Sequence, residues 1–195
     1  LVSGTIKFGT DGKINDHDAT VSDPDFAAFF ITNFNDAEAN HFGFFTKWIG
    51  DITNHTALEV GMRIEQVQSD SGLVNAFPAV LADMGTANGV TTNAQILRNR
   101  FNASDLSQND TNVDAVIKFN HQLTHTINAE LGLARKTRSA SYIEKYLWIP
   151  LEVNAGLGDG NTYIGNPELD PEVSHQVELG LHYDNQQFYF SPRAY

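Results

Sequence analysis

The sequence contains no cysteine, and this absence excludes several kinds of site. Disulfides, thiolate metal sites and cysteine nucleophiles all require the thiol. Soft sulfur ligands are scarce as well, because the chain has only two methionines, Met62 and Met84. We therefore expect no sulfur-based metal centre in this chain.

The sequence also lacks a long hydrophobic run. A transmembrane helix needs about 18 or more consecutive apolar residues, so no such helix is predicted. This does not exclude a β-barrel, whose membrane strands need only about 9–11 residues of alternating hydrophobicity.

Positive charge is scarce, with 12 Lys and Arg against 24 Asp and Glu and a net charge of -12. This balance argues against nucleic acid, and against an anionic membrane surface, as a partner. We interpret the excess of carboxylates as a solvated acidic surface.

Catalytic motifs are missing too. The sequence has no Gly-x-Ser-x-Gly, no His-Glu-x-x-His and no Walker loop, so we expect neither an enzyme nor a cofactor. Residues 156–160 are rich in glycine but neither follow a clear strand nor open a helix, and we expect a loop tip there. The seven histidines are scattered and predict no metal site.

One acidic stretch, residues 11–18, contains Asp11, Asp16 and Asp18 and loosely resembles a calcium loop. The full ligand spacing and its terminal Glu are missing. We interpret the stretch as an acidic turn, and a calcium-dependent surface protein stays a third, weaker alternative for the function.

The clearest positive feature is alternation with a period of two, which is typical of strands. Residues 174–183 place Val177, Leu179, Leu181 and Tyr183 on one face, opposite Gln176, Glu178, Gly180 and His182. Similar patterns predict six further strands, at residues 5–9, 41–50, 56–67, 112–120, 125–136 and 188–195.

The predicted strands are joined in two different ways. Short turns at residues 51–55, 121–124 and 184–187 alternate with long connections at residues 10–40, 68–111 and 137–173. Connections this long are uncommon in compact soluble domains. Short turns on one side and long loops on the other are typical of transmembrane barrels.

The predicted fold is therefore all-β, with about seven antiparallel up-and-down strands that form part of a transmembrane β-barrel in a single domain over residues 1–195. Minor helix is expected within the connection 68–111, at residues 94–101 and 75–84. The alternative is a soluble all-β binding or interaction domain that buries its apolar face against a second sheet of the same chain. That face comprises Leu58, Val60, Met62, Ile64, Ile127, Leu131, Leu179 and Leu181.

A longer motif covers residues 165–180, which read Gly-Asn-Pro-x-Leu-x-Pro-Glu-x-Ser-x-x-x-Glu-x-Gly. It is preceded by Gly-Leu-Ala-Arg-Lys-Thr-Arg-Ser at residues 132–139 and by Tyr142, Glu144 and residues 146–148. Residues 131–181 thus resemble the C-terminal half of TonB-dependent outer-membrane receptors. In that family the motif joins an extracellular loop to the next barrel strand. The stretch from Ala134 to Glu152 resembles a branch that includes copper-associated receptors.

The resemblance implies import of a scarce nutrient across the outer membrane of a Gram-negative bacterium. An iron–siderophore chelate is the first candidate substrate, and copper is the second, with its ligands expected outside this chain. Family members have about 22 strands and a plugged lumen, so this chain would be a fragment that supplies barrel wall and loops. Outer-membrane lipid would be one partner, and the TonB energy-coupling complex would be a partner of the intact receptor only.

Candidate ligand-facing residues lie in the connection 137–173. They are Arg138, Tyr142, Glu144, Tyr146 and Trp148, since aromatic faces and charges can hold a metal chelate. The alternative is that these aromatics pack the loop or join an interfacial aromatic belt. Trp48 and Phe188, near the short turns, are predicted to be membrane anchors.

An open sheet has two free edges and an uncovered apolar face. We therefore expect the excised chain to associate with copies of itself or to require detergent.

Overall fold

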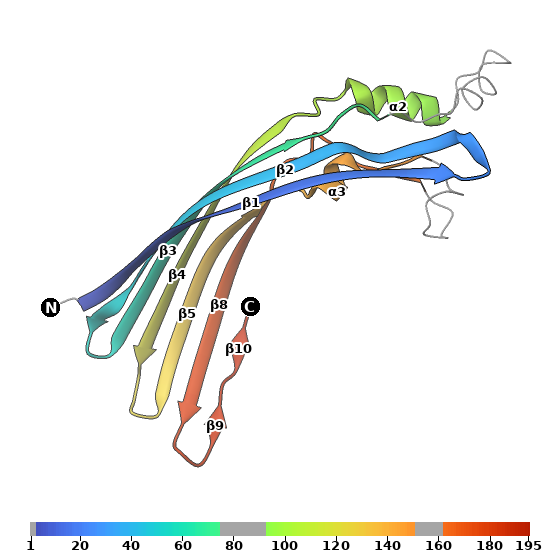
Figure 1. Ribbon diagram of the computed structural model, residues 1–195. Coiled ribbons are helices and arrows are strands. Elements are labelled where there is room, and N and C mark those ends of the chain that lie inside the picture. The colour runs from blue at the N-terminus through green and yellow to red at the C-terminus, as the bar shows by residue number, and fades with distance from the viewer. Residues whose placement is uncertain (1–2, 75–92, 151–161) are drawn as a thin grey trace.

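One antiparallel sheet dominates the computed structural model, which describes residues 3–74, 93–150 and 162–195 (Figure 1). Its strands are β1 (Ser3–Asp23), β2 (Phe26–Thr53), β3 (Thr56–Asp70), β4 (Gln108–Gln122), β5 (Ile127–Arg138), β8 (Glu172–Asp184), β9 (Tyr189–Phe190) and β10 (Arg193–Ala194). They are ordered β1-β2-β3-β4-β5-β8-β10, with β9 also paired to β8. The predicted all-β, up-and-down antiparallel fold is confirmed, and the strands that the structure describes do not close into a barrel.

The strand predicted at residues 188–195 is interrupted. Tyr183 pairs with Phe190 and Gly180 with Arg193, so β9 and β10 keep one register against β8. Pro192 lies between them and has no N–H to donate to the ladder, although its carbonyl accepts a 3.1 Å hydrogen bond from Leu181 N. Because β9 and β10 together occupy one place beside β8, the sheet is seven strands wide, as the alternation predicted.

Short turns and folded connections lie at opposite ends of the sheet (Figure 1). The turns that follow β2, β4 and β8 lie at one end. The other end carries helices α2 (Asn93–Ala103) and α3 (Tyr142–Tyr146) and the strand pair β6 (Trp148–Ile149) and β7 (Tyr163–Ile164). The helix predicted at residues 94–101 is confirmed by α2. The helix predicted at residues 75–84 and the glycine-rich stretch 156–160 lie outside the described residues.

The connection predicted at residues 10–40 is wrong, because β1 and β2 continue through it and meet at a turn formed by Pro24 and Asp25. The acidic turn predicted at residues 11–18 is wrong for the same reason, and the weaker alternative of a calcium loop has no loop to form it. Asp11 and Asp16 stand on opposite faces of β1, where they pair with Gly43 and Glu38 of β2. In the parts of the chain that the structure describes, no three His, Asp or Glu residues are grouped to hold a metal ion.

The alternation divides the sheet into an apolar face and a charged face. The register places Trp48, Val60, Ile117, Leu133 and Val177 in one row on the apolar face. Val177 is 55% exposed and Leu179 56% exposed. No second sheet covers this face in the described residues, so the soluble alternative, which required its burial within the chain, is wrong on this point.

The charged face carries ion pairs between neighbouring strands. They include Lys47–Glu59 at 2.6 Å, Arg193–Glu178 at 2.6 Å and Lys136–Asp114 at 3.6 Å. Arg63 of β3 reaches over Gly43 of β2 to Asp11 of β1, and a Cβ on Gly43 would collide with its guanidinium. Glycine at position 43 therefore permits an ion pair that spans three strands.

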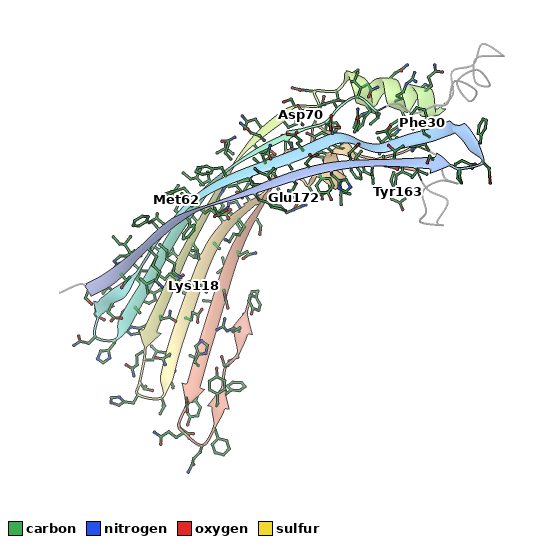
Figure 2. All side chains as sticks on the ribbon, viewed as in Figure 1. Phe30, Met62, Asp70, Lys118, Tyr163 and Glu172 are labelled. Atoms are coloured by element: carbon green, nitrogen blue, oxygen red, sulfur yellow. The ribbon has the colours of Figure 1, made fainter. Side chains whose placement is uncertain are left out.

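The hydrophobic core lies at the helical end of the sheet. It consists of Ile31, Phe34, Ala37, Val74, Phe101, Tyr146 and Trp148. Figure 2 marks two residues of the strands near this end, Asp70 at the end of β3 and Glu172 at the start of β8. Neither described helix has the length and apolar character needed to cross a membrane.

Candidate ligand-facing site

The five predicted ligand-facing residues lie in or beside the first part of the β5–β8 connection, residues 139–171. The structure separates them by exposure. Tyr146 and Trp148 are 0% exposed, whereas Arg138 and Glu144 are exposed and Tyr142 is half-buried. Three of the five are therefore accessible, and two are parts of the core.

A capping box stabilises the start of α3. Ser141 Oγ accepts a hydrogen bond from Glu144 N at 3.3 Å, and the Glu144 carboxylate accepts one from Ser141 N at 2.7 Å. These two bonds satisfy backbone donors that a helix start leaves unpaired, which allows a helix of only five residues. The sequence Ser-x-x-Glu contained this signal.

Arg138 joins three elements at the surface. From the end of β5 it donates to both oxygens of Glu144, at 2.8 and 3.0 Å, and to Glu172 at the start of β8, at 3.1 Å. The Arg138 guanidinium, together with the bonds from Ser141, lowers the pKa of Glu144 to about 2. The carboxylate of Glu144 is therefore ionised throughout the physiological range of pH.

Lys145 points the other way, into the protein. Its Nζ lies 3.0 Å from Asp110 Oδ2 of β4 and 3.4 Å from Ser69 Oγ of β3. The side chains of Lys145 and Asp110 are 1% and 11% exposed. Asp110 and Ser69 both stand on the charged face by register, so the connection folds over that face.

Tyr146 strengthens the same attachment. Its hydroxyl lies 3.0 Å from Ser69 Oγ and donates to Leu106 O at 3.0 Å. Burial raises the pKa of Tyr146 to about 12, so the phenol stays protonated at neutral pH. The hydroxyl has the role of a buried hydrogen-bonding group.

Trp148 and Tyr142 pack against other parts of the core. The Trp148 ring lies 5.7 Å from that of Phe101, centroid to centroid, and Trp148 O accepts a 3.0 Å bond from Asn33 Nδ2. The ring of Tyr142 lies 5.1 Å from that of His17 on β1. Packing thus accounts for Tyr146 and Trp148, while ligand binding by any of the five residues stays a prediction.

The Gly-Asn-Pro motif docks onto α3. Gly165 N donates to Leu147 O at 2.7 Å, and Asn166 N donates to Glu144 O at 2.9 Å. A Cβ on Gly165 would lie 2.5 Å from the carbonyl carbon of Lys145 and 2.7 Å from Tyr146 N. Only glycine allows this close approach between two parts of the connection.

Two residues were missed by sequence reasoning. Lys145 lies among the candidates, but its burial depends on Asp110, 35 positions away, and no local pattern reveals this. Ile143 is 49% exposed on α3, beside Tyr142 and Glu144. In its described residues, the accessible surface of the connection thus combines an apolar side chain, an aromatic ring and ionised groups.

Comparisons with known proteins agree with this architecture. Residues 2–195 match the family described as TonB dependent receptor-like, beta-barrel. A solved structure named copper transporter OprC aligns with 93% of this chain at 16% identity, with a TM-score of 0.58. The chain spans 25% of that protein's length, and at this identity the likeness concerns the fold. No curated relative matches the sequence.

Receptors of this family bind substrates, act together with TonB and reside in the outer membrane of Gram-negative bacteria. Because the match covers nearly the whole chain, the protein belongs to the TonB-dependent receptor β-barrel family.

Proposed function

We propose that this chain forms one wall and part of the extracellular mouth of an outer-membrane receptor that imports a scarce metal substrate. An iron chelate is the first candidate and copper the second. The observation that carries the proposal is the separation of an apolar and a charged face along a sheet whose folded connections lie at one end only. In this reading the chain catalyses no reaction.

The apolar face ends at a polar boundary toward the helical end of the sheet, as expected where tilted strands leave a membrane. Each strand changes there from apolar to polar: Ile14 to Asp16, Phe42 to Asn40, Ile64 to Gln66, Val113 to Thr111, Leu133 to Arg135 and Val177 to His175. Val173 is an apolar exception beyond this boundary.

The register shows that the boundary runs obliquely to the strands. Between β1 and β8 the boundary shifts along the strands by about eight residues, at about 3.3 Å per residue. Across the strands the same interval is five steps of about 4.8 Å each. The resulting tilt is about 45°, close to that of strands in transmembrane barrels. The apolar face would therefore contact outer-membrane lipid, with the charged face toward the lumen.

Aromatic side chains support the same orientation. Phe188, Tyr189 and Phe190, next to the last short turn, are 65–71% exposed. Aromatic residues are enriched where a membrane protein meets the interface. We assign this end to the periplasmic side, with Trp48 and Phe188 as anchors.

The opposite end would then face incoming substrate. The β5–β8 connection folds over the charged face, which would place it inside the mouth of a closed barrel. Arg138, Tyr142 and Glu144 are accessible there, and we propose that they contact the ligand while Tyr146 and Trp148 hold the connection in place. The name of the copper transporter supports copper as the second candidate.

The intact receptor would need parts that this chain does not supply. We propose that residues 1–195 form a single barrel segment, and that a plug domain and the remaining strands belong to the same receptor. Contact with the TonB energy-coupling complex would be made by the intact receptor.

Uptake measurements test the proposal. A strain without the receptor is complemented with the intact receptor, and the import of radiolabelled iron chelates and of copper is measured with and without TonB. We expect receptor-dependent and TonB-dependent import of at least one metal substrate, weakened by Arg138→Gln and unchanged by Asp51→Asn at the opposite end. Equal import with and without the receptor would contradict the proposal.

A further inference from the structure

The net negative charge is distributed unevenly over the structure. Beyond the polar boundary of the apolar face lie residues 16–40, 66–74, 93–111, 135–150 and 162–175, which we call the mouth region. The mouth region carries 13 Asp and Glu against six Lys and Arg, while the remaining described residues carry eight against six. Residues 16–40 alone contribute six carboxylates and no Lys or Arg.

A second observation concerns the basic residues of the mouth region. Arg138 is bound by Glu144 and Glu172, and Lys145 is buried against Asp110. Lys136 lies 3.6 Å from Asp114. Each of these three cations already has a carboxylate partner.

The other three basic residues of the mouth region lie outside the β5–β8 connection, residues 139–171. Arg135 is on the apolar face by register and donates to Val113 O and Thr137 Oγ1. Arg98 and Arg100 are on α2, in no ion pair among the described residues, and Arg98 donates to Asn99 Oδ1. Within the connection the sequence has Lys145 as its only Lys or Arg, and Lys145 is paired with Asp110, so the connection presents no unpaired base to a negatively charged ligand.

From these two observations we infer that the substrate reaches this mouth as a cation, either a metal ion or a metal complex of net positive charge. This inference rests on the proposed function and narrows its substrate class. A region of one sign of charge raises the local concentration of the opposite sign and speeds its association by about 10- to 1000-fold in favourable cases. The same field disfavours an anionic chelate, for which no compensating base stands in the connection.

The inference assigns the attraction of a cation to the electrostatic field of the mouth region and not to one binding residue. Two pairs of carboxylates are exposed and form no ion pair in the described structure. They are Asp16 and Asp18 in the second half of β1, and Glu168 and Asp170 in the Gly-Asn-Pro motif. Their carboxylates can therefore be neutralised without breaking a described contact.

The test uses cells that express the intact receptor and measures initial receptor-dependent uptake of three probes. These are copper(II) without a chelator, a ferric trihydroxamate of positive charge and a ferric tris-catecholate of negative charge. The variants are Asp16→Asn with Asp18→Asn, Glu168→Gln with Asp170→Asn, and the control pair Asp51→Asn with Asp184→Asn at the short-turn end.

We expect uptake of at least one cationic probe, and the first two probes show whether it is the ion or the complex. Each mouth pair should slow that uptake about two- to fivefold at low salt, with a smaller effect at physiological salt because ions screen the field. The control pair should leave uptake unchanged.

Faster uptake of the anionic chelate, accelerated further by the mouth variants, would overturn the inference and leave the proposed import function standing. Uptake of a cationic probe that none of the mouth variants slows would also overturn it. No receptor-dependent uptake of any metal substrate, including neutral chelates, would overturn the proposed function together with the inference.

Discussion

Lys145 Nζ lies 3.0 Å from Asp110 Oδ2, and this contact joins α3 to β4 across 35 positions of sequence. Both side chains are almost fully buried. Together with the bond from Tyr146 to Ser69, the pair fastens the β5–β8 connection to the charged face. The position of the exposed residues on α3 therefore depends on a polar contact beneath them.

The first prediction concerns this contact. Lys145→Met leaves the Asp110 carboxylate buried without a partner, which typically costs about 3–5 kcal/mol. We expect faster amide hydrogen exchange over residues 139–149 of the intact receptor. Lys145→Met combined with Asp110→Asn should recover part of the protection, because no unpaired charge remains.

Lys47→Met is the matched control. Its partner Glu59 is at 2.6 Å, but the two side chains are 37% and 25% exposed, and such pairs contribute about 0–1 kcal/mol. Unchanged exchange in Lys145→Met, or equal changes in both variants, would show that the buried pair does not hold the connection.

The second prediction concerns the Gly-Asn-Pro motif. Gly165→Ala places a Cβ against the backbone of Lys145 and Tyr146, so the connection must shift away from α3. Overpacking of this kind costs about 1–3 kcal/mol. We expect faster exchange of the Gly165 region and weaker ligand binding, measured by titration of the intact receptor. Gly12→Ala, where the nearest atom would be 3.5 Å away, should have little effect on either quantity.

The third prediction is a dependence on pH. The pKa of Glu144 is lowered from 4.5 to about 2 by Arg138 and Ser141, so folding favours its ionised form. This contribution to stability is complete above pH about 4.5 and is lost as the pH falls from there through about 2. The protection factors of residues 141–147 in the intact receptor, which are exchange rates corrected for the intrinsic effect of pH, should therefore fall over this interval. In Glu144→Gln this fall should disappear, and its persistence would assign the effect to another group.

The fourth prediction concerns the excised chain. Its apolar face is exposed, and among the described strands none pairs with the outer edge of β1 or of β10. We expect sedimentation to show large assemblies in plain buffer and a uniform species in mild detergent. A compact monomer in plain buffer at high concentration would contradict this expectation.

The strands were predictable where the two faces meet different surroundings. Val177 and Leu179 alternate with Gln176 and Glu178, and the register follows this pattern across the sheet. The upper half of β1 was missed because polar residues such as Asn15 and Asp16 occupy both of its faces there. Backbone pairing with β2 needs no alternation, so the strand continues without a signal in the sequence.

The site was predictable only in part. The sequence located the β5–β8 connection and its aromatic residues, and the Ser-x-x-Glu pattern contained the start of α3. It could not distinguish Tyr146 and Trp148, which are buried, from Tyr142, which is half-buried. Burial of these residues depends on β2 and α2, which are distant in the sequence and meet only in the folded chain.

The most direct test of the central account is the environment of two neighbouring positions on β8. The chain has no cysteine, so Gln176→Cys and Val177→Cys each give this segment a single labelling site for an environment-sensitive fluorophore. In the intact receptor in liposomes, quenchers placed in the lipid tails should reach the label at position 177 and not the label at position 176. Equal quenching at both positions, or the reverse order, would contradict the assignment of the apolar face to lipid and the charged face to the lumen.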